Sequence, residues 1–349
     1  MAILLGVLIF SFLINALLFI PFINLLYHWK FQRKKQATKD AFMRPTPIFD
    51  RFHKNKAGTP VGGGILTLGT TTILFSIFMI LFHYFWVPIT SIYSCINNGL
   101  YTEIKIVLFT FISFGMLGFF DDVKKIFLQP SDKFFGLRLR YKLVLEIILA
   151  IIISYWFYRE LGIQFINVPF FGVFPVGPFY IPFASFVIVA FANAFNITDG
   201  LDGLASGLLM IALAAFWVIA GSLLDTPLSL FIALWLGALV AFLYFNVHPA
   251  RIFLGDVGAL SFGATLAVIG LLMGRTFSLI IIGGLFVSEA AASLLQLLSK
   301  KFLKRKFFKV APLHLWLQEK GWEEPKVVMR AWLTGIMLAI FGLWLAVIK

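Results

Sequence analysis

Residues 193–203 have the sequence Asn193-Ala-Phe-Asn196-Ile-Thr-Asp199-Gly-Leu-Asp202-Gly203. A nearly uncharged apolar run, residues 180–194, leads into this stretch, and another, residues 204–219, follows it. Two carboxylates and two carboxamides therefore lie where a membrane helix is expected to end. Ionisable side chains beside hydrocarbon cost about 2–3 kcal/mol each, so they typically mark a site for an ion or a substrate. A polar turn between two helices is the simpler alternative, but such a turn needs only one or two of these residues.

The composition is that of an integral membrane protein. Of the 349 residues, 60% are hydrophobic and 13% are charged, and the mean hydropathy is +0.95. A chain of this length holds about ten spans of roughly 20 residues with little left for a soluble domain. We therefore expect an all-α polytopic fold, with one membrane domain over residues 1–349. Cys95 is the only cysteine, which excludes an intramolecular disulfide and a cysteine metal cluster.

Apolar runs predict ten membrane helices, and prolines, glycines and aromatics interrupt them at one place. Residues 162–178 alternate these three kinds of residue, which predicts a small hairpin outside the membrane. The ten predicted helices cover residues 3–27, 61–86, 104–120, 141–158, 177–196, 204–222, 228–246, 257–274, 278–298 and 330–348.

The net charge of +13 does not indicate nucleic acid binding, because the basic residues are confined to a few loops. Of the 29 lysines and arginines, 25 lie in or beside five loops on one side of the predicted bundle. By the positive-inside rule these loops are cytoplasmic, and both termini are outside. The first apolar run lacks a preceding basic region, so we expect it to be retained as a helix. The five loops are residues 28–60, 119–140, 197–203, 247–256 and 299–329.

Residues 54–64 form a polar, glycine-rich segment on the predicted cytoplasmic side. Lys54, Lys56 and Thr59 precede three consecutive glycines. Lysines and glycine amides suit a phosphate group. A flexible loop whose small residues allow close packing is an equally good interpretation.

Further acids and one histidine lie on the same side. Asp121 and Asp122 end the third predicted helix, where the helix dipole disfavours negative charge, so neighbouring lysines or a metal ion should compensate. Asp256 lies between two glycines where another helix begins, and His314 follows a basic run. Acidic oxygens of this type suit Mg²⁺, which typically binds one or two carboxylates together with substrate phosphates. The pattern indicates a phosphoryl-transfer site open to one soluble and one lipid substrate.

Several motifs carry a family resemblance. The stretch 193–205, the pair Asp121-Asp122 and Phe253-Leu-Gly-Asp-Val-Gly-Ala-Leu resemble the polyprenyl-phosphate N-acetylhexosamine-1-phosphate transferases of the glycosyltransferase 4 family. Lys125 stands where the GlcNAc-1-phosphate branch has a further Asp. The tail, residues 308–332, is similar to that of the muramoyl-pentapeptide branch. The resemblance covers residues 50–332.

The resemblance implies a reaction in peptidoglycan biosynthesis at the bacterial cytoplasmic (inner) membrane. Phospho-MurNAc-pentapeptide would pass from UDP-MurNAc-pentapeptide to undecaprenyl phosphate, giving lipid I and UMP with Mg²⁺ as cofactor. Either the lipid phosphate attacks directly, which we favour, or an aspartate first forms a phospho-enzyme. A homodimer is compatible with this reading.

The resemblance also implies roles for individual residues. Asp121, Asp122 and Asp256 would be catalytic, with Asp256 binding the metal and Asp199 as a second candidate ligand. Phe253 would stack on uracil. The implied substrate-binding residues are Lys56, Thr59, Lys125, Asn193, Asn196, Asp199, Asp202, Asn246, Phe253 and His314.

The chain departs from the family pattern at three positions. Leu315 and Trp316 replace two of three consecutive histidines, and Val61 replaces a threonine. These losses bear on the sugar or peptide accepted, so a sister transferase using UDP-GlcNAc or another UDP-HexNAc is the alternative function. A transporter is disfavoured, because its acids would lie near the midplane and often within inverted repeats.

Overall fold

The computed structural model describes residues 2–32, 50–52, 56–127 and 139–348. Long helices dominate this part of the chain, and the all-α polytopic fold expected from the sequence is confirmed. Among the described residues, nine helices are long and apolar enough to cross a membrane, and a tenth span results if one bent helix pair is counted.

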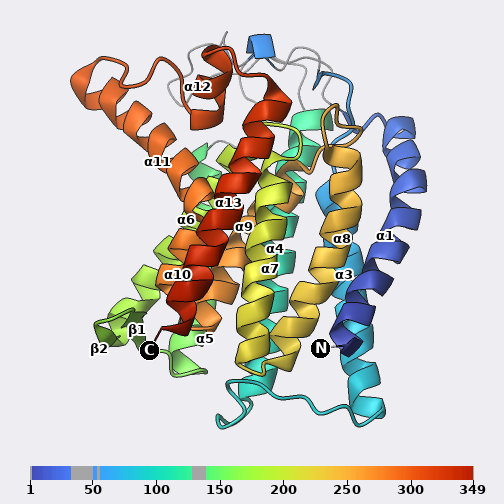
Figure 1. The fold of residues 1–349 in the computed structure, drawn as a ribbon, viewed down its shortest axis with the longest axis vertical. Helices are drawn as coiled ribbons and strands as arrows, with labels where there is room; N and C mark the ends of the chain where they lie inside the picture. The colour runs from blue at the N-terminus through green and yellow to red at the C-terminus, as the bar shows by residue number, and fades with distance from the viewer. Residues whose placement is uncertain (1, 33–49, 53–55, 128–138, 349) are drawn as a thin grey trace.

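The helices alternate in direction and lie side by side (Figure 1). In chain order they are α1 (Ala2–His28), α3 (Gly63–Tyr84), α4 (Gly99–Phe127), α5 (Leu139–Arg159), α6 (Tyr180–Thr198), α7 (Leu204–Ser222), α8 (Thr226–Asn246), α9 (Gly255–Leu272), α10 (Thr276–Ile282), α11 (Gly284–Leu298), α12 (Leu313–Glu319) and α13 (Glu324–Val347).

The predicted hairpin is present between α5 and α6. Strands β1 (Phe165–Val168) and β2 (Gly172–Pro175) pair antiparallel, with Ile166 opposite Phe174. A short 3-10 helix, Gly177–Phe179, then leads into α6, which explains why the prolines of this region do not interrupt the span.

The predicted helix 278–298 is the main difference from the expected spans. It is broken at Gly283 into α10 and α11, whose axes differ by 77°. A Cβ at Gly283 would lie 2.6 Å from the Phe191 ring of α6, so a glycine is needed where the two helices approach. The break directs α11 away from the bundle (Figure 1).

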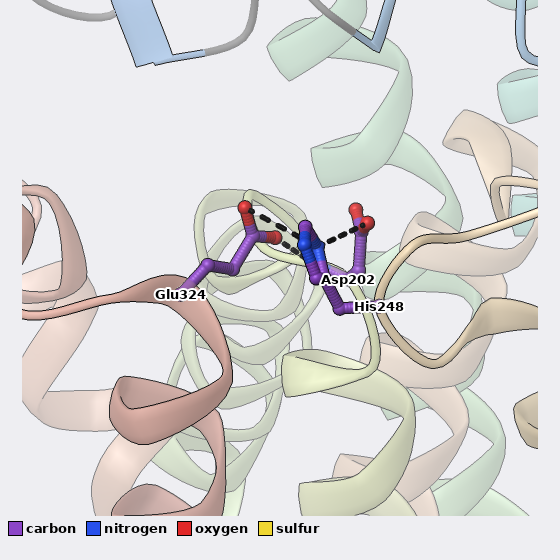
Figure 2. A group of neighbouring side chains, drawn as sticks. All are labelled: Asp202, His248 and Glu324. Carbon is purple, nitrogen blue, oxygen red and sulfur yellow. Dashed lines mark hydrogen bonds and ion pairs between the residues drawn. The ribbon is translucent and has the colours of Figure 1, made fainter.

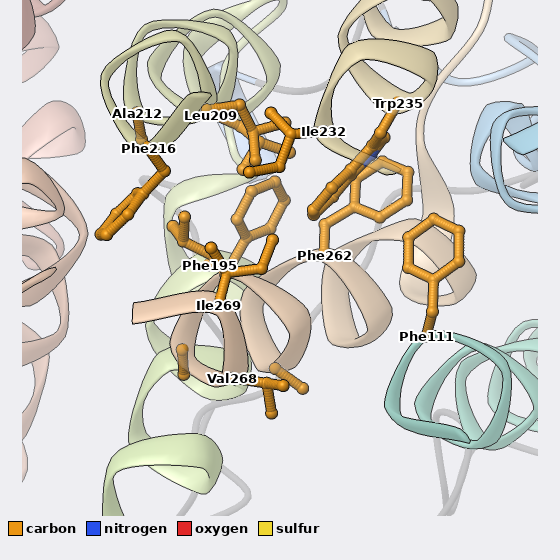
Figure 3. Packing of buried hydrophobic residues seen from close by; sticks show 14 of the residues in the cluster. Phe111, Phe195, Leu209, Ala212, Phe216, Ile232, Trp235, Phe262, Val268 and Ile269 are labelled. Carbon is orange, nitrogen blue, oxygen red and sulfur yellow. The ribbon is translucent and has the colours of Figure 1, made fainter. Parts of the chain in front are cut away.

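Helix α9 is the centre of the bundle. All of its residues are buried, and it packs most extensively against α4 and α6. Phe262 of α9 lies 5.0 Å from the Trp235 ring of α8 and 5.7 Å from the Phe111 ring of α4 (Figure 3). Such aromatic pairs add about 0.5–1.5 kcal/mol each beyond the area they bury.

The N-terminal end of α9 therefore has a fixed position inside the molecule. The C-terminal ends of α4, α6 and α8 and the N-terminal ends of α5, α7 and α13 reach the same level, at the top of Figure 1. Both chain termini and the β1–β2 hairpin lie toward the opposite end.

Candidate active site

Two carboxylates lie against the N-terminus of α9. Asp122 of α4 accepts a hydrogen bond from the Val257 backbone N–H at 3.2 Å, where the helix dipole favours an anion. Gly255, with φ of +81°, allows this approach, because a Cβ there would lie 2.6 Å from Asp122 Oδ2. Asp256 lies in the first turn of the same helix and is 7% exposed.

Two lysines join Asp256 to Asp121. Lys125 Nζ lies 3.0 Å from Asp121 Oδ2 and 2.6 Å from Asp256 Oδ2. Lys142 Nζ, from α5, lies 3.1 Å and 2.7 Å from the same two oxygens. Asp121, Asp122, Asp256, Lys125 and Lys142 together are called the aspartate–lysine cluster. Its lysines provide the positive charge that the acid pair was expected to need.

Asn193 of α6 faces a buried glutamate beside this cluster. Its side-chain amide donates to Glu146 Oε2 at 2.5 Å and to the Val189 carbonyl at 2.9 Å. Both N–H groups are thereby used, which fixes the orientation of the amide and leaves its oxygen as an acceptor. Glu146 is fully buried one helical turn after Lys142.

The glycine segment at the start of α3, residues 62–64, uses its backbone amides in hydrogen bonds within the protein. Gly62 and Gly63 donate to the Phe253 carbonyl at 3.0 and 2.9 Å, and Gly64 donates to the Leu254 carbonyl at 2.9 Å. The amides of these three glycines are therefore not available for a phosphate, so the packing interpretation holds for them. Lys54 lies outside the described residues.

A second polar group, which we call the Lys56 network, lies at the same end of the bundle. Lys56 Nζ contacts Asp202 Oδ1 at 2.7 Å and Glu324 Oε1 at 2.5 Å. His248 Nδ1 lies 3.1 Å from Asp202 Oδ2 and 3.8 Å from Glu324 Oε2. Figure 2 shows the side chains of Asp202, His248 and Glu324 turned toward one another.

Asn246 ends α8, and Phe253 lies in the segment between α8 and α9. Asn246 is buried, accepts from the Gly203 N–H and the Ser206 hydroxyl, and donates to the Ile252 carbonyl at 2.9 Å. Its polar groups therefore hold the loop together. Phe253 is half-buried, and its backbone is fixed by its hydrogen bonds to the glycine segment.

His314 lies at the start of α12 and reaches the loop between α6 and α7. A Cβ at Gly200 would lie 2.6 Å from its Nε2 atom, so the imidazole ring packs against Gly200, the residue after Asp199. The backbone N–H groups of Leu313 and His314 donate to Glu289 of α11, at 2.8 and 3.1 Å.

The three departures from the family pattern all have apolar or aromatic surroundings. Leu315 is 1% exposed and Val61 is 2% exposed. Trp316 carries Lys320 Nζ over its ring at 3.5 Å from the centroid. The first two side chains are part of the packing, and the third is used in a cation–π contact.

The remaining expected residues border these groups. Thr59 is half-buried, and its backbone N–H approaches the Lys56 carbonyl at 3.4 Å. Asp199 is the C-cap of α6 and is also half-buried. The Nδ2 atom of Asn196 is buried and has no hydrogen-bond partner among the described residues, which leaves a donor available one turn before the loop.

The aspartate–lysine cluster fits a hard divalent cation better than the Lys56 network does. Three carboxylates converge on one helix end there, and Mg²⁺ prefers carboxylate oxygens. Asp202, His248 and Glu324 could also hold a metal ion by their spacing. However, that group offers only two carboxylates, and its imidazole suits transition metals better than Mg²⁺.

Five residues of these groups were not expected from the sequence: Lys142, Glu146, His248, Glu289 and Glu324. Lys142 and Glu146 lie four residues apart at the start of a predicted span, and a charged pair in that position is a signal that could have been used. Glu289 lies inside the predicted span 278–298, which is a signal of the same kind, whereas Glu324 has no local signal, because its partners are distant in the sequence.

Comparison with known proteins identifies relatives over nearly the whole chain. Residues 104–274 match the model of glycosyl transferase family 4. A phospho-N-acetylmuramoyl-pentapeptide-transferase of Caldanaerobacter subterraneus is 38% identical, over 83% of this chain and 85% of that protein. Proteins of the same name from Borrelia hermsii and Oceanobacillus iheyensis are 36% and 35% identical. They align over 96% and 97% of this chain and over 92% and 96% of their own lengths.

Proposed function

The chain belongs to the phospho-N-acetylmuramoyl-pentapeptide transferases of glycosyl transferase family 4, and we propose that it catalyses their reaction. Phospho-MurNAc-pentapeptide passes from UDP-MurNAc-pentapeptide to undecaprenyl phosphate, giving lipid I and UMP for peptidoglycan synthesis. The names of the relatives favour this donor over UDP-GlcNAc. The protein is a multi-pass membrane protein, and we assign it to the bacterial cytoplasmic membrane with the site facing the cytoplasm.

One observation carries the proposal beyond the family name. Asp121 and Asp256 share Lys125 and Lys142, at distances of 2.6–3.1 Å, at the end of the bundle where the basic loops gather. Two ammonium groups held by buried acids provide N–H donors for the oxygens of a diphosphate that enters from the helix ends. Positioned charge of this kind is the main requirement of phosphoryl transfer.

The chemistry follows from this arrangement. An oxygen of the lipid phosphate forms a bond to the β-phosphorus of the donor, and the bond from that phosphorus to the bridging oxygen breaks, so that UMP leaves with the oxygen. Lys125 and Lys142 bind the phosphate oxygens on which negative charge accumulates. Asp121 and Asp122 orient these cations and the α9 terminus, and either acid can accept a proton if the lipid phosphate arrives protonated.

Direct attack agrees better with these contacts than a phospho-enzyme does. Asp121 and Asp256 are each held by two ammonium groups. A carboxylate bound in this way is a weakened nucleophile, because attack would require it to leave both partners. Asp256, with Asp121 and Asp122 beside it, would hold Mg²⁺, which when bound neutralises charge on the diphosphate.

The proposal is tested with purified protein in detergent or nanodiscs. UMP release is measured with UDP-MurNAc-pentapeptide, undecaprenyl phosphate and Mg²⁺, and each component is then omitted in turn. We expect release only with all three, loss on chelation and recovery when Mg²⁺ is added back. UMP release without undecaprenyl phosphate would contradict the lipid acceptor. UMP release that continues in excess chelator would contradict the requirement for Mg²⁺.

A further inference from the structure

Glu324 is a half-buried acid for which neither the family resemblance nor the proposed mechanism provides a role. It lies in the first turn of α13, and its side chain is 9% exposed. Its partners are Lys56 and Asp202, two residues expected to bind the donor. Lys56 and Glu324 are 268 positions apart in the sequence, so the contact depends entirely on the fold.

The hydrogen bonds of Glu324 join two otherwise separate segments. Its Oε1 atom accepts from Lys56 Nζ at 2.5 Å and from the Asp202 backbone N–H at 2.7 Å. The Asp202 side chain in turn accepts from Lys56 Nζ at 2.7 Å and from the Ala250 backbone N–H at 3.1 Å. One carboxylate oxygen thereby fixes the segment before α3 relative to the loop between α6 and α7.

These contacts leave Lys56 ready for a ligand. An ammonium group has three N–H donors, and Asp202 and Glu324 occupy two of them. Within the described part of the chain no acceptor takes the third donor, and the lysine side chain is 14% exposed. A lysine held in this way loses little conformational entropy when it binds, which favours affinity.

A second contact from α13 supports the same loop. Trp332 Nε1 donates to the Gly203 carbonyl at 3.1 Å, next to Asp202. With this bond and Glu324, α13 holds the loop at two adjacent backbone positions. The start of α13 is therefore built to fix the geometry of this loop.

We infer that Glu324 is a positioning residue for nucleotide recognition. It orients Lys56 and the Asp202 backbone so that together they receive the uridine phosphate part of the donor. The inference rests on the proposed function and adds a residue to it. Glu324 pairs with Lys56, whereas Asp256 pairs with Lys125 and Lys142, so we expect the reacting phosphates and the lipid acceptor to depend on residues other than Glu324.

The test compares Glu324→Ala and Glu324→Gln with the neighbouring control Glu323→Gln in the full-length protein. Glu323 is exposed and belongs to the same turn. UMP binding is measured by calorimetry, and kinetics are measured with both substrates. Folding of each variant is verified by thermal unfolding.

Glu324→Ala is expected to raise the Kd for UMP and the KM for the UDP-linked donor about tenfold, because hydrogen bonds to charged groups are lost. Glu324→Gln, which keeps the acceptor but loses the charge, should raise both about threefold. The KM for undecaprenyl phosphate and kcat should stay within about twofold of the wild-type values. The same holds for every value measured with Glu323→Gln.

Two outcomes overturn the inference. One is an unchanged Kd for UMP in folded Glu324→Ala or, if that variant does not fold, in Glu324→Gln. The other is a parallel loss in kcat and in both KM values, which indicates a general structural role.

A double-mutant cycle tests the route through Lys56. Glu324→Gln should change the Kd for UMP by a smaller factor in a Lys56→Met background than in the wild type. An equal change in the Kd for UMP in the two backgrounds would contradict the idea that Glu324 acts through Lys56. A wild-type protein that neither binds nor releases UMP refutes the proposed function together with the inference, whereas an active wild type with insensitive Glu324 variants refutes the inference alone.

Discussion

At the scale of single residues, Asp256 is the acid on which the proposed chemistry depends most. It lies in the first turn of the central helix and contacts both Lys125 and Lys142. Asp121 contacts the same two lysines, so they keep a buried partner when Asp256 is removed. Loss of the Asp256 carboxylate should therefore affect catalysis far more than folding.

We predict that Asp256→Ala lowers kcat by about a thousandfold, as expected when a preorganised charge in a transition-state site is lost. The thermal unfolding temperature should remain close to that of the wild type. The measurement is UMP release from purified protein, with Glu160→Gln at the opposite end of the bundle as a control of unchanged activity. Activity near the wild-type level in Asp256→Ala would refute the assignment.

Single residues also show where sequence reasoning succeeds and where it stops. Asp121, Asp122 and Asp256 stand out because acids beside apolar runs are unusual. Glu324 does not stand out, because it lies in a tail with many charges and gains its partners only through the fold. The sequence also did not show what the side-chain amides of the two asparagines do. Asn246 makes hydrogen bonds within the protein, whereas Asn193 uses its N–H groups there and keeps its oxygen as an acceptor.

At the scale of elements, the contact between α7 and α13 positions the loop that carries Asp202. Trp332 packs on Gly207 of α7, and a Cβ at that glycine would clash with the indole ring. Small residues at such crossings allow membrane helices to approach closely.

Gly207→Ala should therefore destabilise the protein by about 1–3 kcal/mol, the range for overpacking a tight contact. It should also weaken UMP binding, because the loop before α7 shifts. Gly69→Ala on α3 is the matched control, since a Cβ there meets nothing within 4 Å. Thermal unfolding of both variants measures the difference, and equal unfolding temperatures would count against the contact.

The start of α8 gives a prediction about pH. Asp225 caps this helix by accepting from the Leu228 backbone N–H at 3.0 Å. Burial raises the pKa of the Asp225 carboxyl above its ordinary value of 3.8, although the backbone N–H groups of Leu228 and Ile92 oppose the shift. The folded state therefore binds this proton more tightly than the unfolded state does, so stability increases as pH falls through the raised pKa toward 3.8.

Asp225→Asn, which cannot titrate, should lack this contribution. As the pH falls toward 3.8, the unfolding temperature of the wild type should therefore rise relative to that of the variant. Both proteins are measured by thermal unfolding in the same detergent. A difference that stays constant with pH, or that reverses, contradicts the raised pKa.

Helix boundaries were predicted where their causes are local in the sequence and missed where their causes are distant. The hairpin at residues 165–175 and most spans were predicted, because hydropathy and turn residues act locally. The break at Gly283 was missed, because glycine is common in membrane helices and only the approach of Phe191 shows why the chain bends there. α4 and α13 also begin several residues before their predicted starts.

At the scale of the whole molecule, the arrangement of charge implies an orientation in the membrane. The candidate site lies at the end of the bundle that carries the basic loops, and both termini lie toward the other end. Cys95, the only cysteine of the chain, is exposed in the connection between α3 and α4, also away from the site.

This placement makes the orientation testable by labelling the native thiol of Cys95 and comparing it with a thiol at the other end of the bundle. A membrane-impermeant maleimide should label Cys95 in intact spheroplasts, because the positive-inside rule puts that connection outside. The double variant Cys95→Ser/Lys306→Cys moves the thiol to an exposed position of the basic loop and should react only after permeabilisation. The reverse pattern would show that the bundle is inverted.

The most direct test of the central claim compares two donors in one assay. Purified protein with undecaprenyl phosphate and Mg²⁺ is given UDP-MurNAc-pentapeptide or UDP-GlcNAc, and both UMP and the lipid product are quantified. The family assignment and the aspartate–lysine cluster predict UMP and a muramoyl-pentapeptide lipid from the first donor, with at least about a hundredfold lower kcat/KM for the second. Equal or greater turnover of UDP-GlcNAc, or no UMP from the muramoyl donor, would contradict the claim.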